Sequence, residues 1–420
     1  MKKEVTAQGP TLYRAPYVVP VTSPLLIDGG VLVDRGRIMA VDRYSRLRPE
    51  AARVVELEGR IITPALINCH CHLELSSLAG LGQDGSVPAG DMTAWIRLLL
   101  AKREAAVDQT AIRQAGEAAL AEQHRRGVAL VADIGNQPAS LASAGDNQTE
   151  VLFFQELLGT TAQAAQAVLA ALSPAGEVNY TVHAPYSCHP RLITAVKERS
   201  CRLGGLFPIH VAESADEIEF LQTGRGRFRD FLAERLTLAG VLAPAQDVAE
   251  LVSIPGCGSI EYLHRLGALD HRTICVHSVH ISAAEADMIA TAQAKVSLCP
   301  GSNRRLGVGK APLPLLLERQ IRPGLGTDSL ASNDRLDLWQ EMMVLQSDHV
   351  RVSPELIFSM ATRGGAETLA VAHRLGTLAP GREAKLLAVA FDGAAPDVYP
   401  FLVNSGEAID VEWLETGHDE

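Results

Sequence analysis

The sequence predicts an α/β protein, a (β/α)8 barrel with a small β-sandwich domain formed by both chain ends. Three observations support this fold. Short apolar runs alternate with helical patterns through the middle of the chain, five of those runs finish at a His or an Asp, and both ends are rich in strand-forming residues. Alternating strands and helices predict a parallel sheet, and the active sites of such barrels lie at the carboxyl ends of their strands. A doubly wound open sheet is the alternative fold.

The two chain ends are expected to make one domain from residues 1–63 and 375–420. β-rich segments separated by Gly, Asp and Pro lie at Tyr17–Thr22, Gly30–Asp34 and Arg37–Asp42, and the segment Gly376–Ala390 has a similar character. Such punctuated runs are typical of short strands. Because these ends flank a middle of different composition, they are expected to pair with each other.

The barrel is expected over residues 64–374. Helical patterns at Met92–Glu104, Gln109–Arg126 and Pro190–Leu203 separate the apolar runs. Strand–helix units repeated over about 300 residues match the usual size of this barrel. The eight runs are Ala65–Cys69, Ala129–Ile134, Val151–Phe154, Tyr180–His183, Leu206–Val211, Thr273–His277, Val296–Cys299 and Arg322–Thr327.

Composition excludes several classes of protein. The net charge of −11 over 420 residues argues against a nucleic-acid partner, which needs clustered Lys and Arg. No apolar stretch reaches 18 residues, so no membrane span is expected, and the first residues lack the apolar region of a signal peptide. Seven cysteines without a CxxC pair indicate reduced thiols in a cytoplasmic protein. The sequence is compatible with a homodimer.

His70 and His72 carry the most informative signal. They follow the first barrel run, and residues i and i+2 of a strand point the same way, so both imidazoles can reach one metal ion. Polar clusters also mark the ends of later runs, with His210 and Glu213 at the end of the fifth, His277 and His280 at the end of the sixth, and Asp328 at the end of the eighth.

His70, His72, His210 and Asp328 can together supply the ligands of one catalytic metal. A zinc site with three or four nitrogen and oxygen ligands leaves a position for water, whose pKa then falls toward ~7. Asp328 can bind the metal and also take a proton from the attacking water.

Glu213 is the expected general acid and base, because it stands three residues beyond His210 and is free to face the substrate. Either His277 or His280 can polarise the attacking water or the developing oxyanion. His277 is favoured because it stands at the strand terminus.

The order His70-x-His72, His210, His277 and Asp328 resembles that of the amidohydrolase superfamily, over nearly the whole chain. The segments 64–76, 183–190, 299–303 and 327–333 resemble its mononuclear deaminase and chlorohydrolase branch. Within that branch, the segments 186–190, 303–307 and 333–339 are most similar to aminofutalosine deaminases of menaquinone biosynthesis.

This resemblance implies one divalent metal ion, with zinc as the first expectation and iron as the second, held by the four ligands named above. It implies that Glu213 shuttles a proton and that His277 assists the water, with Asp328 as the third catalytic group. His183 and Asn303 would contact the substrate, and Ser187 and His189 lie on neighbouring strand-end loops. The implied substrate is a small 6-aminopurine nucleoside, aminofutalosine first.

Other activities stay open at this stage. The alternatives are deamination of S-adenosylhomocysteine, methylthioadenosine, adenosine or guanine, and hydrolysis of a chlorotriazine. From a different class, the chain could be a metal-binding barrel scaffold without activity, although such a scaffold has no need for Glu213 beside the metal. Substrate selection is expected in loops such as Gly80–Asp91 and Asn136–Asp146.

Overall fold

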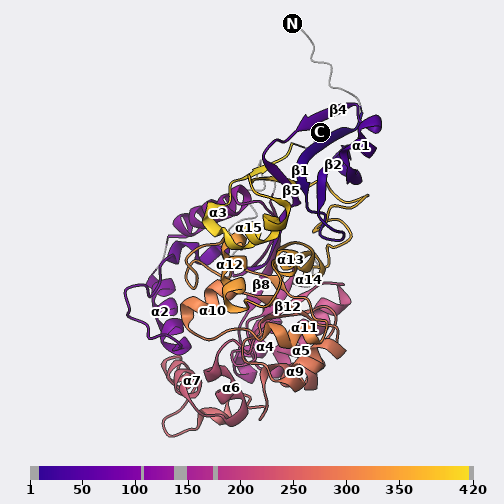
Figure 1. Cartoon of the computed structure of the whole chain (residues 1–420). Helices are drawn as coiled ribbons and strands as arrows, with labels where there is room; N and C mark the ends of the chain where they lie inside the picture. The colour runs from indigo at the N-terminus through magenta and orange to yellow at the C-terminus, as the bar shows by residue number, and fades with distance from the viewer. Residues whose placement is uncertain (1–8, 106–107, 137–148, 174–177, 416–420) are drawn as a thin grey trace.

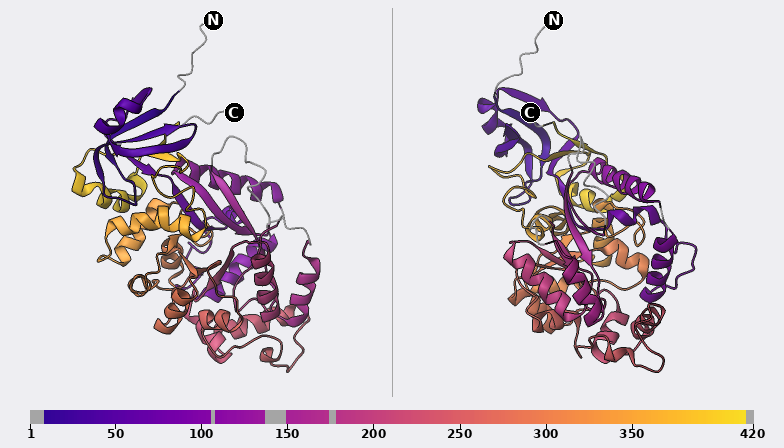
Figure 2. Two further views of the ribbon diagram at one scale, coloured as in Figure 1. Left: turned by 90° about the vertical axis from the view of Figure 1, so that its right-hand side faces the viewer. Right: turned by 180° about the vertical axis from the view of Figure 1, so that it is seen from behind.

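The computed structural model describes residues 9–105, 108–136, 149–173 and 178–415. The molecule is elongated, with a sheet of N-terminal and C-terminal strands at one end and a larger body of strands and helices below it (Figure 1). The same division is visible from the side and from behind (Figure 2).

All eight predicted barrel runs form strands. They make up two parallel four-stranded sheets within the described part of the chain. The first sheet contains β6 (Leu66–Cys71), β7 (Val128–Gly135), β8 (Glu150–Leu157) and β9 (Tyr180–Val182). The second contains β10 (Phe207–Val211), β11 (Thr273–His277), β12 (Lys295–Leu298) and β13 (Gly324–Leu325).

Backbone hydrogen bonds connect the two sheets on both sides. The His210 N–H on β10 donates to the His183 carbonyl just after β9, at 3.0 Å. On the other side, the N–H groups of Thr327 and Asp328 both donate to the His70 carbonyl on β6, at 3.0 Å. The body therefore has a TIM-barrel-type α/β fold, and it brings the ends of β6, β10 and β13 together.

Helices surround these strands. The predicted segments 92–104, 109–126 and 190–203 appear as α2, α3 and α5. Asp108 caps α3 by accepting from the N–H groups of Thr110 and Ala111, as Asp commonly does at this position. The helices of the body are α2 (Met92–Ala105), α3 (Gln109–Arg125), α4 (Ala162–Ala171), α5 (Pro190–Arg202), α6 (Ala215–Thr223), α7 (Arg227–Leu238), α8 (Ser259–Arg265), α9 (Ala283–Thr291), α10 (Pro300–Leu306), α11 (Leu313–Glu318), α12 (Leu338–Asp348), α13 (Pro354–Ser359) and α14 (Gly365–Thr368).

Both chain ends share one sheet, as expected, and it has seven strands in the described residues. C-terminal β14 pairs antiparallel with N-terminal β5, with Leu386 opposite Pro64 and Ala390 opposite Arg60. The strands are β1 (Thr11–Val18), β2 (Leu26–Asp34), β3 (Arg37–Arg43), β4 (Arg53–Glu56), β5 (Arg60–Pro64), β14 (Leu386–Ala390) and β15 (Val411–Trp413), with the short helix α1 (Tyr44–Leu47) after β3.

The C-terminal segment is not purely β-rich, and this part of the expectation was wrong. Residues Val398–Asn404 form α15, which packs against α12 and α13. Val398 and Leu402, one helical turn apart, are fully buried in the same core cluster as the barrel residues. The C-terminal segment therefore contacts both parts of the molecule: α15 packs on the body, and β14 pairs with the end sheet.

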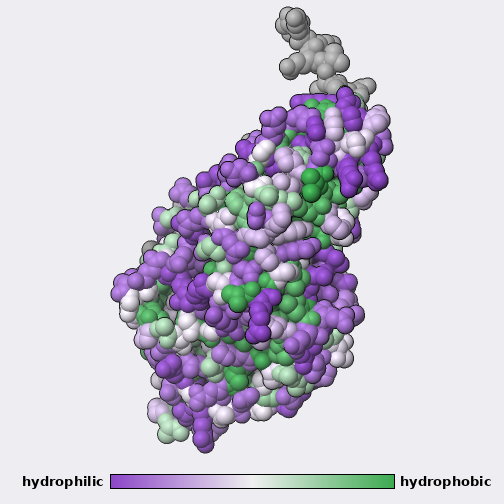
Figure 3. Space-filling model, viewed as in Figure 1, coloured by the Kyte–Doolittle hydropathy of each residue, from purple (hydrophilic) through white to green (hydrophobic). Residues whose placement is uncertain are grey.

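The surface in the view of Figure 3 is mostly hydrophilic, with apolar residues in small groups between the polar ones. Among the described helices, none has both the length and the apolar character needed to cross a membrane.

Candidate active site

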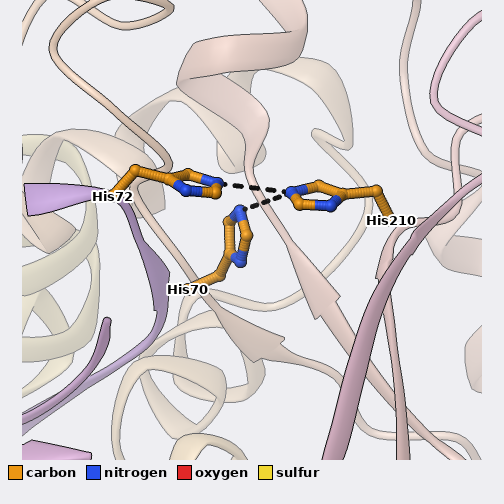
Figure 4. Close-up of side chains that lie close together, drawn as sticks. All are labelled: His70, His72 and His210. Carbon is orange, nitrogen blue, oxygen red and sulfur yellow. Dashed lines mark hydrogen bonds between the residues drawn. The ribbon is translucent and has the colours of Figure 1, made fainter. Parts of the chain in front are cut away.

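Four side chains from three strand ends converge at one point. His70 and His72 come from the end of β6, His210 from β10, and Asp328 from the segment after β13. His210 Nε2 lies 3.3 Å from His70 Nε2 and 3.3 Å from His72 Nε2 (Figure 4). Asp328 Oδ1 lies 3.5 Å from the Nε2 atoms of both His70 and His72.

These distances fit a metal site. In a tetrahedron with metal–nitrogen bonds of about 2.0–2.1 Å, neighbouring ligand atoms are about 3.4 Å apart. The separations of 3.3 and 3.5 Å between the Nε2 and Oδ1 atoms match that edge. Three neutral imidazoles and one carboxylate are also a donor set that suits zinc or iron. The predicted ligands are therefore brought together as a set.

Hydrogen bonds orient two of these ligands. The hydrogen-bond network assigns a proton to His210 Nδ1, which donates to the His183 carbonyl at 2.8 Å and leaves Nε2 with a free lone pair. Asp328 Oδ2 accepts from the hydroxyls of Ser302 and Ser332, each at 2.6 Å. Since Oδ2 is occupied, Oδ1 is the atom that faces the histidines.

The chain around Asp328 explains how β13 reaches β6 so closely. A Cβ atom on Gly326 would stand 2.7 Å from the His70 Cβ, so only glycine allows this approach. Asn68 binds the same segment, because its Nδ2 donates to Thr327 Oγ1 at 2.8 Å and its Oδ1 accepts from the Thr327 N–H. Asp328 itself has a left-handed φ of 58°, a strained conformation often found at functional sites.

Burial keeps the three histidines neutral, whereas the neighbouring histidines keep Asp328 ionised. Burial lowers the pKa of His72 to about 4, and it lowers the pKa of His70 and of His210 as well. For Asp328, burial alone would raise the pKa, but its interactions with His70 and His72 outweigh this effect and lower the pKa. The Asp328 pKa consequently lies well below its usual range.

Glu213 and His277 stand beside this centre. Glu213 Oε1 lies 3.6 Å from His277 Nε2, and burial raises the pKa of Glu213 to about 7. His277 Nδ1 is 3.0 Å from Asn303 Oδ1, so it donates to that oxygen and directs Nε2 toward Glu213. His280 instead has its Nε2 2.7 Å from the Val308 carbonyl, a structural contact. The geometry favours His277 over His280, as expected.

A cavity of about 300 Å³ opens over these groups. Its polar wall includes His183 and Ser187, whose Nδ1 and Oγ atoms lie 2.8 Å apart. Its apolar wall comes from α2 and α7, whose apolar residues in the lining are Met92, Trp95, Ile96, Leu99, Leu100, Phe231 and Leu232.

His189 and Asn303, which were expected to contact substrate, are not among the residues that line the cavity. His189 caps α5, because its Nδ1 accepts from the Arg191 N–H at 3.2 Å. Asn303 is only 2% exposed and lies behind His277. Their positions correct the sequence expectation: His189 supports a helix, and Asn303 orients His277.

Sequence reasoning missed several charged groups of the cavity. Glu156 lies two residues beyond the predicted third run, because β8 continues to Leu157. Burial, reinforced by the charge of Glu74, raises the pKa of Glu156 to about 8. Glu74 itself pairs with Arg103 at 3.0 Å, and both line the cavity together with Arg235. Extending the predicted third strand from Phe154 to Leu157 would have placed Glu156 near a strand end and revealed it.

The two loops expected to select substrate have different outcomes. None of the residues Gly80–Asp91 lines the cavity, and the wall begins at Met92 on α2. In the loop Asn136–Asp146, residues 137–146 lie outside the described residues.

Comparisons with known proteins show what this chain is similar to. The model of the amidohydrolase family matches residues 61–408. A 5-methylthioadenosine/S-adenosylhomocysteine deaminase of Desulfitobacterium hafniense is 26% identical over 405 residues, covering 91% of this chain and 85% of that protein.

Two solved structures share the fold. The aminofutalosine deaminase of Helicobacter pylori in complex with methylthio-coformycin has a TM-score of 0.77 at 24% identity, covering 93% of this chain and 96% of that one. A zinc-bound adenosine deaminase from Xanthomonas campestris has a TM-score of 0.73 at 22% identity, covering 94% of this chain and 88% of that one. At this level of identity, the likeness concerns the fold.

Proposed function

The chain belongs to the amidohydrolase family, and on this basis we propose that it is a metal-dependent hydrolytic deaminase of a 6-aminopurine nucleoside, aminofutalosine first. One observation carries the proposal. The ligand atoms of His72, His210 and Asp328 face the same cavity as the carboxyl group of Glu213. A metal site alone would serve a scaffold, but a buried carboxyl with a pKa of about 7 beside it serves proton transfer.

His70, His72, His210 and Asp328 would hold the ion, zinc before iron. When bound, a divalent ion supplies Lewis acidity that lowers the pKa of water toward ~7 and stabilises negative charge on the oxygen. The hydrogen bonds to His210 and Asp328 described above fix the direction of their ligand atoms.

Glu213 performs the proton transfers. As water adds to C6 of the purine, the carboxyl group of Glu213 gives its proton to the adjacent ring nitrogen and takes one from the water. It then passes this proton to the 6-amino group, which leaves as ammonia, while the remaining hydroxyl proton on C6 returns to the Glu213 carboxylate and C6 becomes a carbonyl carbon. His277, held by Asn303 through Nδ1, directs the lone pair of Nε2 toward Glu213, where it can accept from and so polarise the attacking water.

The apolar wall of the cavity supports aminofutalosine as the first substrate. Its sugar carries an aromatic carboxylate, which requires an apolar wall and a cation. Trp95 and Phe231 supply apolar surface, and Arg103 and Arg235 lie on the same two helices, where they pair with Glu74 and Glu104. The second candidate is a methylthioadenosine or S-adenosylhomocysteine deaminase, which is favoured by the relative from Desulfitobacterium hafniense.

Three further assignments belong to this proposal. Residues 64–374 would form the closed barrel, with residues 1–63 and 375–420 in a β-sandwich beside it. The protein would act in the cytoplasm, and it would form a homodimer.

The substrate is tested by ultraviolet detection of the adenine-to-hypoxanthine change, with ammonia release as a second readout. The panel contains aminofutalosine, methylthioadenosine, S-adenosylhomocysteine, adenosine, adenine, guanine and a chlorotriazine. We expect kcat/KM for aminofutalosine to lie well above that for adenosine and free adenine to be poor, because unmatched buried polar groups discriminate by orders of magnitude. Preference for guanine or the triazine would contradict the nucleoside assignment.

A further inference from the structure

Glu156 is a buried carboxyl group of the cavity that the deamination chemistry does not use. It lies near the carboxyl end of β8, its side chain is 8% exposed, and it belongs to the cavity wall. Its Oε1 atom is buried and has no hydrogen-bond partner among the described residues. Such an atom costs free energy unless a ligand or water satisfies it.

Glu156 does not serve as the orienting partner of His210. Its Oε1 lies 3.9 Å from His210 Nδ1, beyond hydrogen-bond distance, and that nitrogen already donates to the His183 carbonyl at 2.8 Å. The tautomer of the metal ligand is therefore fixed without Glu156.

His183 offers a second acceptor on the same wall. The Ser187 hydroxyl donates to the Ala184 carbonyl at 3.2 Å, so Ser187 Oγ accepts from the His183 Nδ1–H at 2.8 Å. In a neutral ring, this arrangement leaves Nε2 as an acceptor. One carboxylate oxygen of Glu156 and one ring nitrogen of His183 lie within 4.8 Å of each other.

Two neighbouring acceptors require a ligand with two neighbouring donors. A nucleoside offers such a pair in its 2′- and 3′-hydroxyls, and carboxylates bind ribose hydroxyls in other nucleotide sites. The apolar wall on α2 and α7 has no such acceptors and suits a ring or an apolar substituent.

We propose that Glu156, together with His183, binds the vicinal hydroxyls of the substrate's ribose and makes the site selective for ribonucleosides over deoxyribonucleosides. This assignment rests on the proposed function, since it places a nucleoside in the cavity. It makes Glu156 a specificity-determining residue with no part in the proton transfers.

The test measures binding separately from turnover. Isothermal titration with inosine, 2′-deoxyinosine and 3′-deoxyinosine gives Kd values for the wild-type metal-loaded protein and for Glu156→Gln. The wild type should bind inosine about 10- to 100-fold more tightly than either deoxynucleoside, the usual effect of leaving a buried hydrogen-bonding group without its partner. In Glu156→Gln the ratio should fall to within about threefold of unity.

A matched control is Thr160→Val. Thr160 also lines the cavity, but its hydroxyl already donates to the Ser187 carbonyl at 3.2 Å, so the ribose preference should be unchanged.

Metal content is measured in every variant, because a role of Glu156 in positioning the metal ligands would lower the metal content of Glu156→Gln. The same Kd for all three ligands in the wild type, or an unchanged ratio in Glu156→Gln, would overturn the proposal. Ribose-selective binding without release of ammonia from any 6-aminopurine nucleoside would leave this subsite intact and contradict the proposed function instead.

Discussion

Two carboxyl groups of one cavity have opposite pKa shifts, and their partners explain the difference. Interactions with His70 and His72 outweigh burial at Asp328 and hold its pKa well below the usual range. Glu213 is buried without an equivalent donor, and its pKa rises to about 7. An ionised ligand beside a carboxyl group that titrates near neutrality is the division of roles that a hydrolytic deaminase requires.

Glu213→Gln should retain the metal and lose about 10²-fold or more of kcat, the usual scale for removal of a general acid or base. Because the acid form of Glu213 donates to the ring nitrogen, and its raised pKa keeps that form populated up to about pH 7, wild-type kcat/KM should fall as pH rises through that value. Steady-state kinetics between about pH 5 and 9 measure both effects. Asp216→Asn, three residues later in the first turn of α6 and paired with Arg227, is the control and should retain activity. Near-normal turnover in Glu213→Gln would remove the proton-shuttle role.

At the scale of elements, the segment after β13 and the helix α10 hold Asp328 jointly. Ser332 comes from the first and Ser302 from the second, and both donate to Asp328 Oδ2. Glu341 on α12 connects the same two elements, since it accepts from the Gly301 N–H and from Asn333 Nδ2, each at 2.7 Å. The ligand carboxylate is therefore oriented by three separate parts of the chain.

Ser302→Ala should lower metal affinity by about 10- to 100-fold, as is usual for the partners that orient metal ligands. The expected cause is free rotation of the Asp328 carboxylate after the loss of one of its two donors. Competition with a chromophoric chelator measures the affinity, and Ser347→Ala, an exposed serine on α12, is the control. Equal affinities in the two variants would show that Ser332 alone suffices.

The elements also show what a single sequence can and cannot predict. The convergence of His70, His72, His210 and Asp328 was predictable because each stands at or beside the end of an apolar run. His189 was misassigned because spacing from a strand end does not reveal where a side chain points, and this one caps α5. The cavity wall on α7 was missed because it lies in a helical segment between β10 and β11 that no strand-end pattern marks.

At the scale of the whole molecule, the last segment of the chain supports both the end sheet and the body. β14 lies between β5 and β15, and α15 packs on α12 and α13. Arg126 on the body donates to the carbonyls of Gly406 and Ile409, at 2.9 and 2.7 Å. Pairing of the chain ends was predictable from their composition, whereas the role of α15 depends on packing between distant segments.

A chain that ends at Arg374 should be insoluble or melt at a markedly lower temperature. It would expose the edge of β5 and remove Leu386, Leu387, Val398 and Leu402, each fully buried and each contributing about 1.5–3 kcal/mol. Solubility and thermal unfolding are compared with those of a chain that ends at Glu415, which retains all described contacts. Equal melting temperatures in the two would show that the chain ends do not depend on each other.

The most direct measurement for the whole mechanism is a metal titration of activity. Protein stripped of metal by a chelator is mixed with increasing zinc, and deamination of the preferred nucleoside is followed in the ultraviolet. Activity should be absent at the start, rise linearly and saturate at one equivalent per chain, while His72→Ala should need a large excess of zinc. Full activity in the stripped protein, or saturation only at two equivalents, would contradict catalysis by one ion held by His70, His72, His210 and Asp328.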